Sequence, residues 1–324
     1  MISLEYHTDT ERRDITGYTG RYSRSDSLES LGMAFRFTLS DGDPEEDRTL
    51  EVGGRVTFTH NGTTVFSGII VTMDRRSLTE YEYTAFDYAF YLNKSEVMIQ
   101  FNDIPITEAL TRLCSENDIP VGTITKISTK VTKIYSGSVI SDVIRDLLKI
   151  ASDETGARYR LEVRDNKLFI EDYKELVVQT EYQPAAGPAF DPILCIGSMN
   201  AAASMEDMKN RVIVMSSNEK NAQILAQVKD QDGIGKFGLL TKVEKIDDKN
   251  ESQAANIAEK LLNDLNRIRK SFRVTLFGDD RIRSGRTIVF RTPEIGLEGA
   301  FLVKSCQHDY TGDFNHTMTL EVDA

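Results

Sequence analysis

Alternating apolar and polar residues recur in both outer thirds of the chain, and this pattern restricts the fold more than any other feature of the sequence. In MAFRFTLSD, for example, Phe35, Phe37 and Leu39 are separated by small or polar residues. A period of two is typical of a strand that buries one face and exposes the other. The chain is therefore expected to be mainly β, with antiparallel strands.

The N-terminal third is expected to form one β-domain. Asn61-Gly62 lies between two β-rich runs, RVTFTH and TTVFSGIIVTM, and this dipeptide is a strong signal for a two-residue hairpin turn. The aromatic-rich run YEYTAFDYAFYL (81–92) adds a further predicted strand. Since no helical pattern separates these runs, residues 1–95 are predicted to form a small antiparallel barrel or sandwich.

Helical periodicity first appears shortly after residue 95. The run IPITEALTRLCSEN places Ile106, Leu110, Leu113 and Cys114 on one helical face, and Thr107 is the expected N-cap. A β-like run, IPVGTITKI, follows this helix.

The clearest helix of the first half lies in GSVISDVIRDLLKIASDETG. Ser138 is the expected cap at its start and Gly156 at its end. ARYRLEV and LFIEDY then pair across the turn at 164–167, so residues 96–185 are predicted to form a small mixed α/β domain. The apolar stripe of the helix consists of Val139, Ile140, Val143, Ile144, Leu147, Leu148 and Ala151.

The C-terminal third returns to β-patterning. The run YQPAAGPAFDP (182–192) contains three of the seven prolines and is expected to be a linker. Beyond it, alternation returns in RVIVMS, GLLTKVEKI, FRVTLFGD, RTIVFRT, AFLVKSCQHDY and HTMTLEV. One long helix interrupts these strands, with an apolar stripe of Ile257, Leu261, Leu265 and Ile268.

These segments together predict an α+β fold that is mainly β. Two antiparallel β-barrel-like domains, at residues 1–95 and 186–324, would flank the small α/β insert domain of residues 96–185. The second β-domain would carry the one long helix.

Composition excludes several classes of function. The net charge of −12, from 39 basic and 51 acidic residues, argues against specific nucleic-acid binding, which needs clustered Lys and Arg. Cys114, Cys195 and Cys306 are odd in number and far apart, so no disulfide framework is expected. The N-terminus lacks the apolar region of a signal peptide and no run has the length of a membrane span, so we expect folding in a cytosol.

The run GIGKFG matches the dinucleotide-binding pattern G-x-G-x-x-G at Gly233, Gly235 and Gly238. That function requires a helix directly after the glycines, because the helix N-terminus holds the pyrophosphate. Here the pattern LLTKVEKI predicts a strand, and no helix is expected before about residue 251. We therefore predict a glycine-rich turn between strands, with Phe237 packed beneath it, and no cofactor.

Cys306, His308 and His316 are the candidate metal ligands. Positions 306 and 308 share one face of a predicted strand, and the TGDFN turn returns His316 towards them. Since no fourth ligand stands at a recognisable spacing, paired polar residues on a terminal hairpin are favoured over a zinc site. We also find no nucleophile elbow and no Cys-His signature, and predict no catalytic residue and no enzyme.

Five stretches, in this order, resemble one family: the baseplate hub proteins of contractile phage tails and phage-tail-like bacteriocins of the PBSX (Xkd-like) type. They are YTAFDYAFYLNKSEVMIQF (83–101), IPVGTI (119–124), SMEDMKNRVIVMS (204–216), KDQDGIGKFGLLTKVEKID (229–247) and LVKSCQHDYTGDFNHTMTLEV (302–322). The fourth has Phe237 where a Tyr is usual in the family. The resemblance covers nearly the whole chain and extends to the hubs of T-even phages and to late-control D-type proteins.

The resemblance implies a structural, trimeric hub in which each subunit supplies two tube domains. Three subunits would present a pseudo-sixfold ring that adapts the sixfold tail tube to the threefold central spike. The implied partners are the tube or a tube-initiator protein, the spike, baseplate wedge proteins and a tape-measure protein in the channel. The implied location is the baseplate of a virion or tail-like particle assembled in bacterial cytoplasm, without membrane contact.

Two alternatives remain open from the sequence. One is a tail-tip cell-wall hydrolase that acts through a carboxylate pair, since 51 acidic residues offer many such pairs. The other is a spike-base protein of a type VI-like secretion system, which would have the same fold in a different machine.

Overall fold

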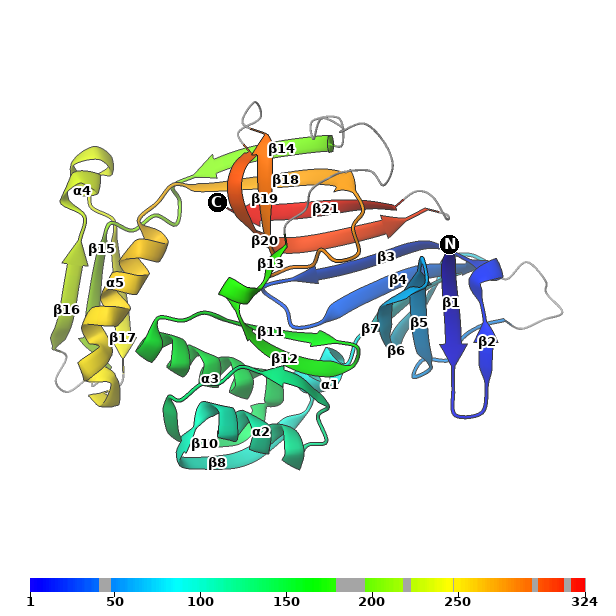
Figure 1. Cartoon of the computed structure of the whole chain (residues 1–324), viewed down its shortest axis with the longest axis horizontal. Helices are drawn as coiled ribbons and strands as arrows, with labels where there is room; N and C mark the ends of the chain where they lie inside the picture. Colours follow the sequence, from blue (N-terminus) through cyan, green and yellow to red (C-terminus); the bar gives the residue numbers. More distant parts are fainter. Residues whose placement is uncertain are drawn as a thin grey trace.

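A computed structural model describes residues 1–40, 48–178, 196–217, 223–246, 248–292, 297–311 and 316–323. These residues form a large sheet of thirteen strands, three small sheets and the helices that pack on them (Figure 1). The expected linker at 182–192 lies outside the described residues. No helix among those described has the length and apolar character needed to cross a membrane.

The N-terminal part is built of antiparallel strands, as predicted. The hairpin at Asn61-Gly62 is confirmed, because both residues have positive φ (50° and 79°), as a two-residue turn requires. The elements are β1 (Ile2–His7), β2 (Arg12–Asp14), the 3-10 turn η1 (Thr16–Tyr18), β3 (Thr19–Ser27), β4 (Met33–Ser40), β5 (Arg55–His60), β6 (Thr63–Arg75) and β7 (Glu80–Phe86). These strands share one hydrophobic core, whose largest side chains include Tyr6, Phe35, Phe37, Phe58 and Tyr83.

The middle part is a mixed α/β unit around its own core. Its elements are α1 (Ala89–Lys94), β8 (Glu96–Pro105), α2 (Ile106–Glu116), β9 (Val121–Ile124), β10 (Lys130–Val139), α3 (Ile140–Thr155), β11 (Tyr159–Arg164), β12 (Lys167–Asp172) and the 3-10 turn η2 (Tyr173–Glu175). The predicted stripes of α2 and α3 are buried, with the exception of Val139, which precedes α3. The turn between β11 and β12 is confirmed, with positive φ at Asp165 and Asn166.

Three local predictions in this region were wrong. The strand expected over 81–92 ends at Phe86, and α1 follows it. Thr107 lies inside α2, and its hydroxyl bonds the backbone of Ile127 instead of capping the helix. Ser138 belongs to β10, where no side chain caps α3, whereas Gly156 ends α3 with φ 71°, as predicted.

The C-terminal part adds strands to the large sheet and forms a separate small unit. Its elements are β13 (Val177–Val178), β14 (Ile196–Ser204), β15 (Arg211–Ser216), β16 (Ile224–Lys229), α4 (Gln231–Phe237), β17 (Thr241–Ile246), the 3-10 segment η4 (Asp248–Gln253), α5 (Ala254–Leu265), β18 (Arg269–Phe277), β19 (Thr287–Thr292), β20 (Leu297–Tyr310) and β21 (His316–Asp323). The long helix ends earlier than expected. Ile268 therefore lies outside α5 and is 43% exposed.

The outer parts are not two separate barrels. Strand β20 pairs antiparallel with β3, so one sheet runs in the order β14-β18-β21-β20-β3-β4-β7-β6-β5-β1-β2 through both. The mainly β prediction is confirmed, but no closed barrel is found among the described residues. The physical reason is that both parts leave an edge strand unpaired, and these two edges complete each other's backbone hydrogen bonds. The boundaries at residues 95 and 185 stay predictions.

A small unit stands apart at one end of the molecule (Figure 1). We call residues 205–268 the side module. It consists of a three-stranded sheet, ordered β16-β15-β17, with α5 packed on one face against Val212 and Val214. It is inserted between β14 and β18, two strands that pair with each other.

The GIGKFG run lies in this side module, and the prediction that no helix forms there was wrong. Helix α4 spans Gln231–Phe237, directly after strand β16. The Asp230 side chain caps it by accepting a hydrogen bond from the N–H of Asp232. The helix has only seven residues and ends at Gly238, with φ 80°. Phe237 is half-buried beside Lys236.

Candidate functional site

Eight neighbouring strands of the large sheet share one largely polar face, on which Phe86 and the 61% exposed Phe277 also lie. They are β14, β18, β21, β20, β3, β4, β7 and β6, and every neighbouring pair is antiparallel. One side of this run faces the apolar cores, because residues such as Val274, Leu320 and Phe35 point there. The other side carries short polar residues, including Ser198, Thr275, Thr319, Gln307 and Ser25.

Side-chain hydrogen bonds cross this polar face from strand to strand. Ser198 Oγ donates to Thr275 Oγ1 at 3.1 Å, and Thr275 and Thr319 hydroxyls lie 3.2 Å apart. In the next row, Arg273 pairs with Glu321 at 3.8 Å. No residue named for this face is fully buried. The surface is therefore accessible to water and carries charges of both signs. These properties suit the lining of a channel or a hydrated contact with another protein.

Both ends of the eight-strand run are open among the described residues. At one end, β14 pairs only with β18, and its side chains from Gly197 to Ser204 are all exposed. At the other end, β6 pairs with β5 as far as Ile69, while its last residues, Val71–Arg75, pair only with β7 on the other side. Strand β14, with the sequence IGSMNAAAS, contains no charge and no proline, the devices that normally protect an edge.

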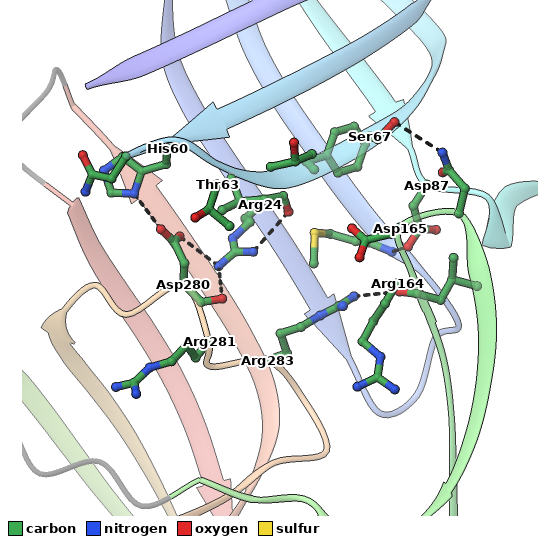
Figure 2. A pocket seen from close by; sticks show the side chains of 17 residues that line it. Arg24, His60, Thr63, Ser67, Asp87, Arg164, Asp165, Asp280, Arg281 and Arg283 are labelled. Carbon is green, nitrogen blue, oxygen red and sulfur yellow. Dashed lines mark hydrogen bonds and ion pairs between the residues drawn. The ribbon is translucent and has the colours of Figure 1, made fainter. Parts of the chain in front are cut away.

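The junction of the two outer parts contains a buried ion cluster, shown in Figure 2. Asp280, from the loop between β18 and β19, accepts hydrogen bonds from Arg24 Nη2 at 3.1 Å and from His60 Nδ1 at 2.6 Å. Tyr310 Oη donates a third hydrogen bond to it at 2.6 Å. Arg24 is only 3% exposed, and its second nitrogen also bonds the carbonyl of Val65. Although burial raises the pKa of Asp280, the Arg24 charge and these hydrogen bonds outweigh it and hold the pKa below its usual value.

The middle part also reaches this junction, around a cavity of about 400 Å³ (Figure 2). Arg283 donates to the carbonyl of Val163 at 3.0 Å, and Asn166 donates to Ser67 at 3.4 Å. Glu162 of β11 and Arg286, which directly precedes β19, form a further buried bidentate ion pair at 2.7 and 3.0 Å. Burial alone would raise the pKa of Glu162, but the hydrogen bonds and charge of Arg286 lower it.

The three predicted candidate ligands do meet in space. His308 Nε2 lies 2.9 Å from the carbonyl of Ile282, which can only accept, so Nε2 carries the proton. His308 Nδ1 then accepts from His316 Nε2 at 2.8 Å, and Cys306 Sγ lies 3.0 Å from His308 Nε2. Burial lowers the pKa of both imidazoles, that of His316 to about 4, so both are neutral near pH 7.

A metal ion does not suit these residues. His60, Asp280 and His316 each offer a ligand atom within 4.8 Å of the others, a set that sequence spacing could not reveal. However, the Arg24 guanidinium already neutralises Asp280, and a divalent cation beside it would add unbalanced buried charge. His316 Nε2 also donates its proton to His308, so that atom has no free lone pair. That there is no metal site stays a prediction.

The cluster instead holds the N-terminal and C-terminal parts together at their junction. His60 and Arg24 come from the N-terminal strands, whereas Asp280, Tyr310 and His316 come from the C-terminal part. Burial raises the pKa of the Cys306 thiol well above its usual value, so this cysteine is a poor nucleophile. The sequence pattern did not reveal Arg24, His60 and Asp280 as a group, because Asp280 follows the other two by more than 200 residues. The pairing of β20 with β3 joins the two parts that carry them.

Comparison with known proteins adds independent information. The YQBQ-like family model matches residues 23–323. The protein XkdQ of the phage-like element PBSX, from Bacillus subtilis (strain 168), is 26% identical over 338 residues, covering 99% of this chain and 97% of XkdQ. The resemblance drawn from the five stretches is thereby confirmed.

Solved structures share the fold. A tail protein from Neisseria meningitidis MC58 superposes with a TM-score of 0.70 at 15% identity, covering 100% of this chain and 96% of that one. The Escherichia coli protein c3393, described as a component of the type VI secretion system with similarity to the T4 tail proteins gp27 and gp5, gives 0.54 at 10% identity, covering 94% and 73%. The chain belongs to the YQBQ-like family and is a homologue of the PBSX protein XkdQ.

Proposed function

We propose that this protein is a structural hub of a phage or phage-like tail, and that three copies close a ring around a central channel. A role in a tail is supported by its homologue XkdQ, from a phage-like element, together with the shared fold of the Neisseria meningitidis tail protein. The observation that carries the ring is the eight-strand run with one polar face and two open edges. Such edges hold unpaired N–H and C=O groups, which a neighbouring copy can satisfy.

The strand directions permit this closure. Because the run has an even number of antiparallel strands, β14 and β6 point in opposite directions. The end of β6 in one copy can therefore pair antiparallel with β14 of the next copy, and the pattern continues without a break. Three copies of eight strands give twenty-four strands in a closed ring. The contact is heterologous, as a cyclic trimer requires.

The size of this ring suits a channel. With neighbouring strands about 4.8 Å apart, twenty-four strands have a circumference of roughly 115 Å, and hence a diameter of about 37 Å before strand tilt. The apolar cores lie on one side of the sheet, so the polar face would line the lumen. Short hydroxyl and mixed charged side chains there would let a tape-measure protein or DNA pass without sticking.

We infer the partners of this ring from the resemblance to the hub family. Each copy supplies two sheet segments, one N-terminal and one C-terminal, so three copies present six similar segments to a sixfold tail tube or its initiator. The opposite rim would hold the threefold spike, with wedge proteins outside. A second candidate is the spike base of a type VI-like secretion system, which the likeness to the fold of c3393 favours. Its spike and tube partners would then differ, but the ring would be the same.

Native mass spectrometry of the purified chain, alone and with its tube and spike partners, tests the ring. We expect trimers that negative-stain images show as threefold rings. Replacing Ala201 and Ala203 on the β14 edge with lysine should abolish them, because lysines on an edge block strand pairing. The matched change Thr10→Lys, in the exposed turn between β1 and β2, should leave the trimer intact. A monomer under all these conditions would refute the proposal.

A further inference from the structure

The side module presents a bare sheet face to the outside. Its helix α5 covers one face and also touches α3 of the middle part. Asp264 of α5 pairs with Arg158, and Lys260 pairs with Asp153 at 3.4 Å. Helix α5 packs on one face of the module's sheet (Figure 1), and its ion pairs with Arg158 and Asp153 turn this face towards the middle part. The other face of the sheet lies opposite α5.

This outer face is apolar in the middle and basic around it. Alternation along the strands places Ile213 and Met215 on it, because their neighbours Val212 and Val214 are buried under α5. Cross-strand pairing adds Val243 and Ile224, which are 48% and 65% exposed. The charged residues paired on this face are Arg211, Lys229 and Lys245, and no described residue on it is acidic, although the chain has a net charge of −12.

A second bare face lies on the ribbon of β8 and β10. Helices α2 and α3 pack on its inner side around Ile99, Phe101 and Tyr135. Its outer side carries Met98 and Ile134, which are 83% and 65% exposed and sit on neighbouring registers. Glu96 is exposed at one end of this side. Large apolar side chains with such exposure, grouped on one side of a ribbon, are typical of a contact surface.

The directions of the strands bring these two faces, from neighbouring copies of the ring, next to each other. Strands β7 and β14 run in the same direction, since six antiparallel steps separate them. The middle part follows β7 and the side module follows β14, so both project from the same rim of the sheet. In the proposed ring, β6 and β7 of the next copy lie beside β14. The middle part of that copy therefore stands next to the outer face of the side module.

We propose that the outer face of the side module docks on the β8–β10 ribbon of the next copy. This inference rests on the proposed ring and adds a second contact to it. Each side module would be held between α3 of its own chain and the ribbon of its neighbour, so that modules and middle parts alternate as a collar. Apolar residues would meet at the centre of this contact, and Glu96 at the end of the ribbon's outer side offers an acidic group to the basic residues.

Photocrosslinking in the assembled full-length protein tests this contact. A benzoylphenylalanine at Val243 should crosslink to residues 96–104 or 130–139 of a second copy, identified by mass spectrometry. The same probe at Thr10 should give no such crosslink. If threefold rings form but the probe at Val243 reaches another region, another protein or nothing, the docking is refuted while the ring stands. If no ring forms, both proposals fall.

Two charge insertions give an independent measure. Val243→Asp and Met98→Asp should each raise the dissociation constant of the trimer by roughly tenfold or more, with unchanged melting of the monomer. Combined, they should raise it by less than the product of the two, because they disrupt one contact. Thr10→Asp is the control, since Thr10 lies in the exposed turn between β1 and β2, outside both proposed contacts. Equal effects of all three changes would overturn the proposed docking.

Discussion

The ion cluster around Asp280 should dominate the coupling between the N-terminal and C-terminal parts, and Asp280→Ala tests this. The change leaves the guanidinium of Arg24, which is 3% exposed, without its carboxylate, and removes the acceptor of His60 and Tyr310. Breaking a buried ion pair by removing one partner costs about 3–5 kcal/mol of unfolding free energy. Asp280 is itself 23% exposed at its side chain, so we expect the lower end, about 3 kcal/mol.

Urea denaturation, followed by circular dichroism, measures this loss. Arg24→Met alone should also destabilise the fold, since it leaves the largely buried Asp280 carboxylate with its hydrogen bonds from His60 and Tyr310 but without a neutralising guanidinium. The double change Arg24→Met with Asp280→Ala should lose clearly less than the sum of the single losses, because no uncompensated charge remains. The Asp279→Ala variant is a matched control, because Asp279 pairs with the exposed Arg281 next to it. This account of the junction would be refuted if the losses of unfolding free energy from Arg24→Met and Asp280→Ala were additive. It would also be refuted if Asp280→Ala lost no more unfolding free energy than Asp279→Ala.

Three further predictions concern stability. Burial lowers the pKa of His316 to about 4, so the unfolded chain binds the extra proton between about pH 6.5 and 4; the native state loses stability as pH falls through this window. Burial raises the pKa of Asp87 to about 7, so Asp87 changes the stability with pH in the opposite direction. Denaturation of the wild type and of His316→Asn should therefore be compared over this pH range. The variant should lack the part of the stability change that His316 causes. Gly238→Ala should destabilise by about 1 kcal/mol because its φ is 80°, whereas Gly235→Ala, with open space in α4, should be neutral or stabilising in thermal melts; equal effects would contradict this. Glu162→Ala should cost about 3 kcal/mol by urea titration, because Arg286 stays buried and unpaired, and a loss below about 1 kcal/mol would contradict the buried pair.

Strand and helix types could be predicted from the sequence wherever one face is buried. The alternation in β4 and the stripes of α2 and α3 report burial directly, because apolar residues must recur with the period of the element. The turns at Asn61-Gly62 and at 164–167 were also predictable, since their backbones need residues that tolerate positive φ. Short elements such as α1 and α4 escaped prediction, because six or seven residues carry too little periodicity.

The union of both outer parts in one sheet could not be predicted. It depends on β20 pairing with β3, two strands separated by about 270 residues, and alternation does not say which strand is the neighbour. The same holds for the ion cluster, whose members look like ordinary surface residues in the sequence. Only Cys306, His308 and His316 could be grouped, because they share one hairpin. The side module and its bare face likewise became visible only with the sheet order β16-β15-β17.

The central claim is that copies of this chain join through the open edges of one sheet. Electron cryomicroscopy of the chain assembled with its tube and spike partners tests it most directly. We predict a threefold ring in which β14 of each copy pairs antiparallel with Val71–Arg75 of the next, with the face that carries Thr275 and Thr319 towards the lumen. A ring in which β14 remains solvent-exposed, or in which the polar face points outward, would contradict the account.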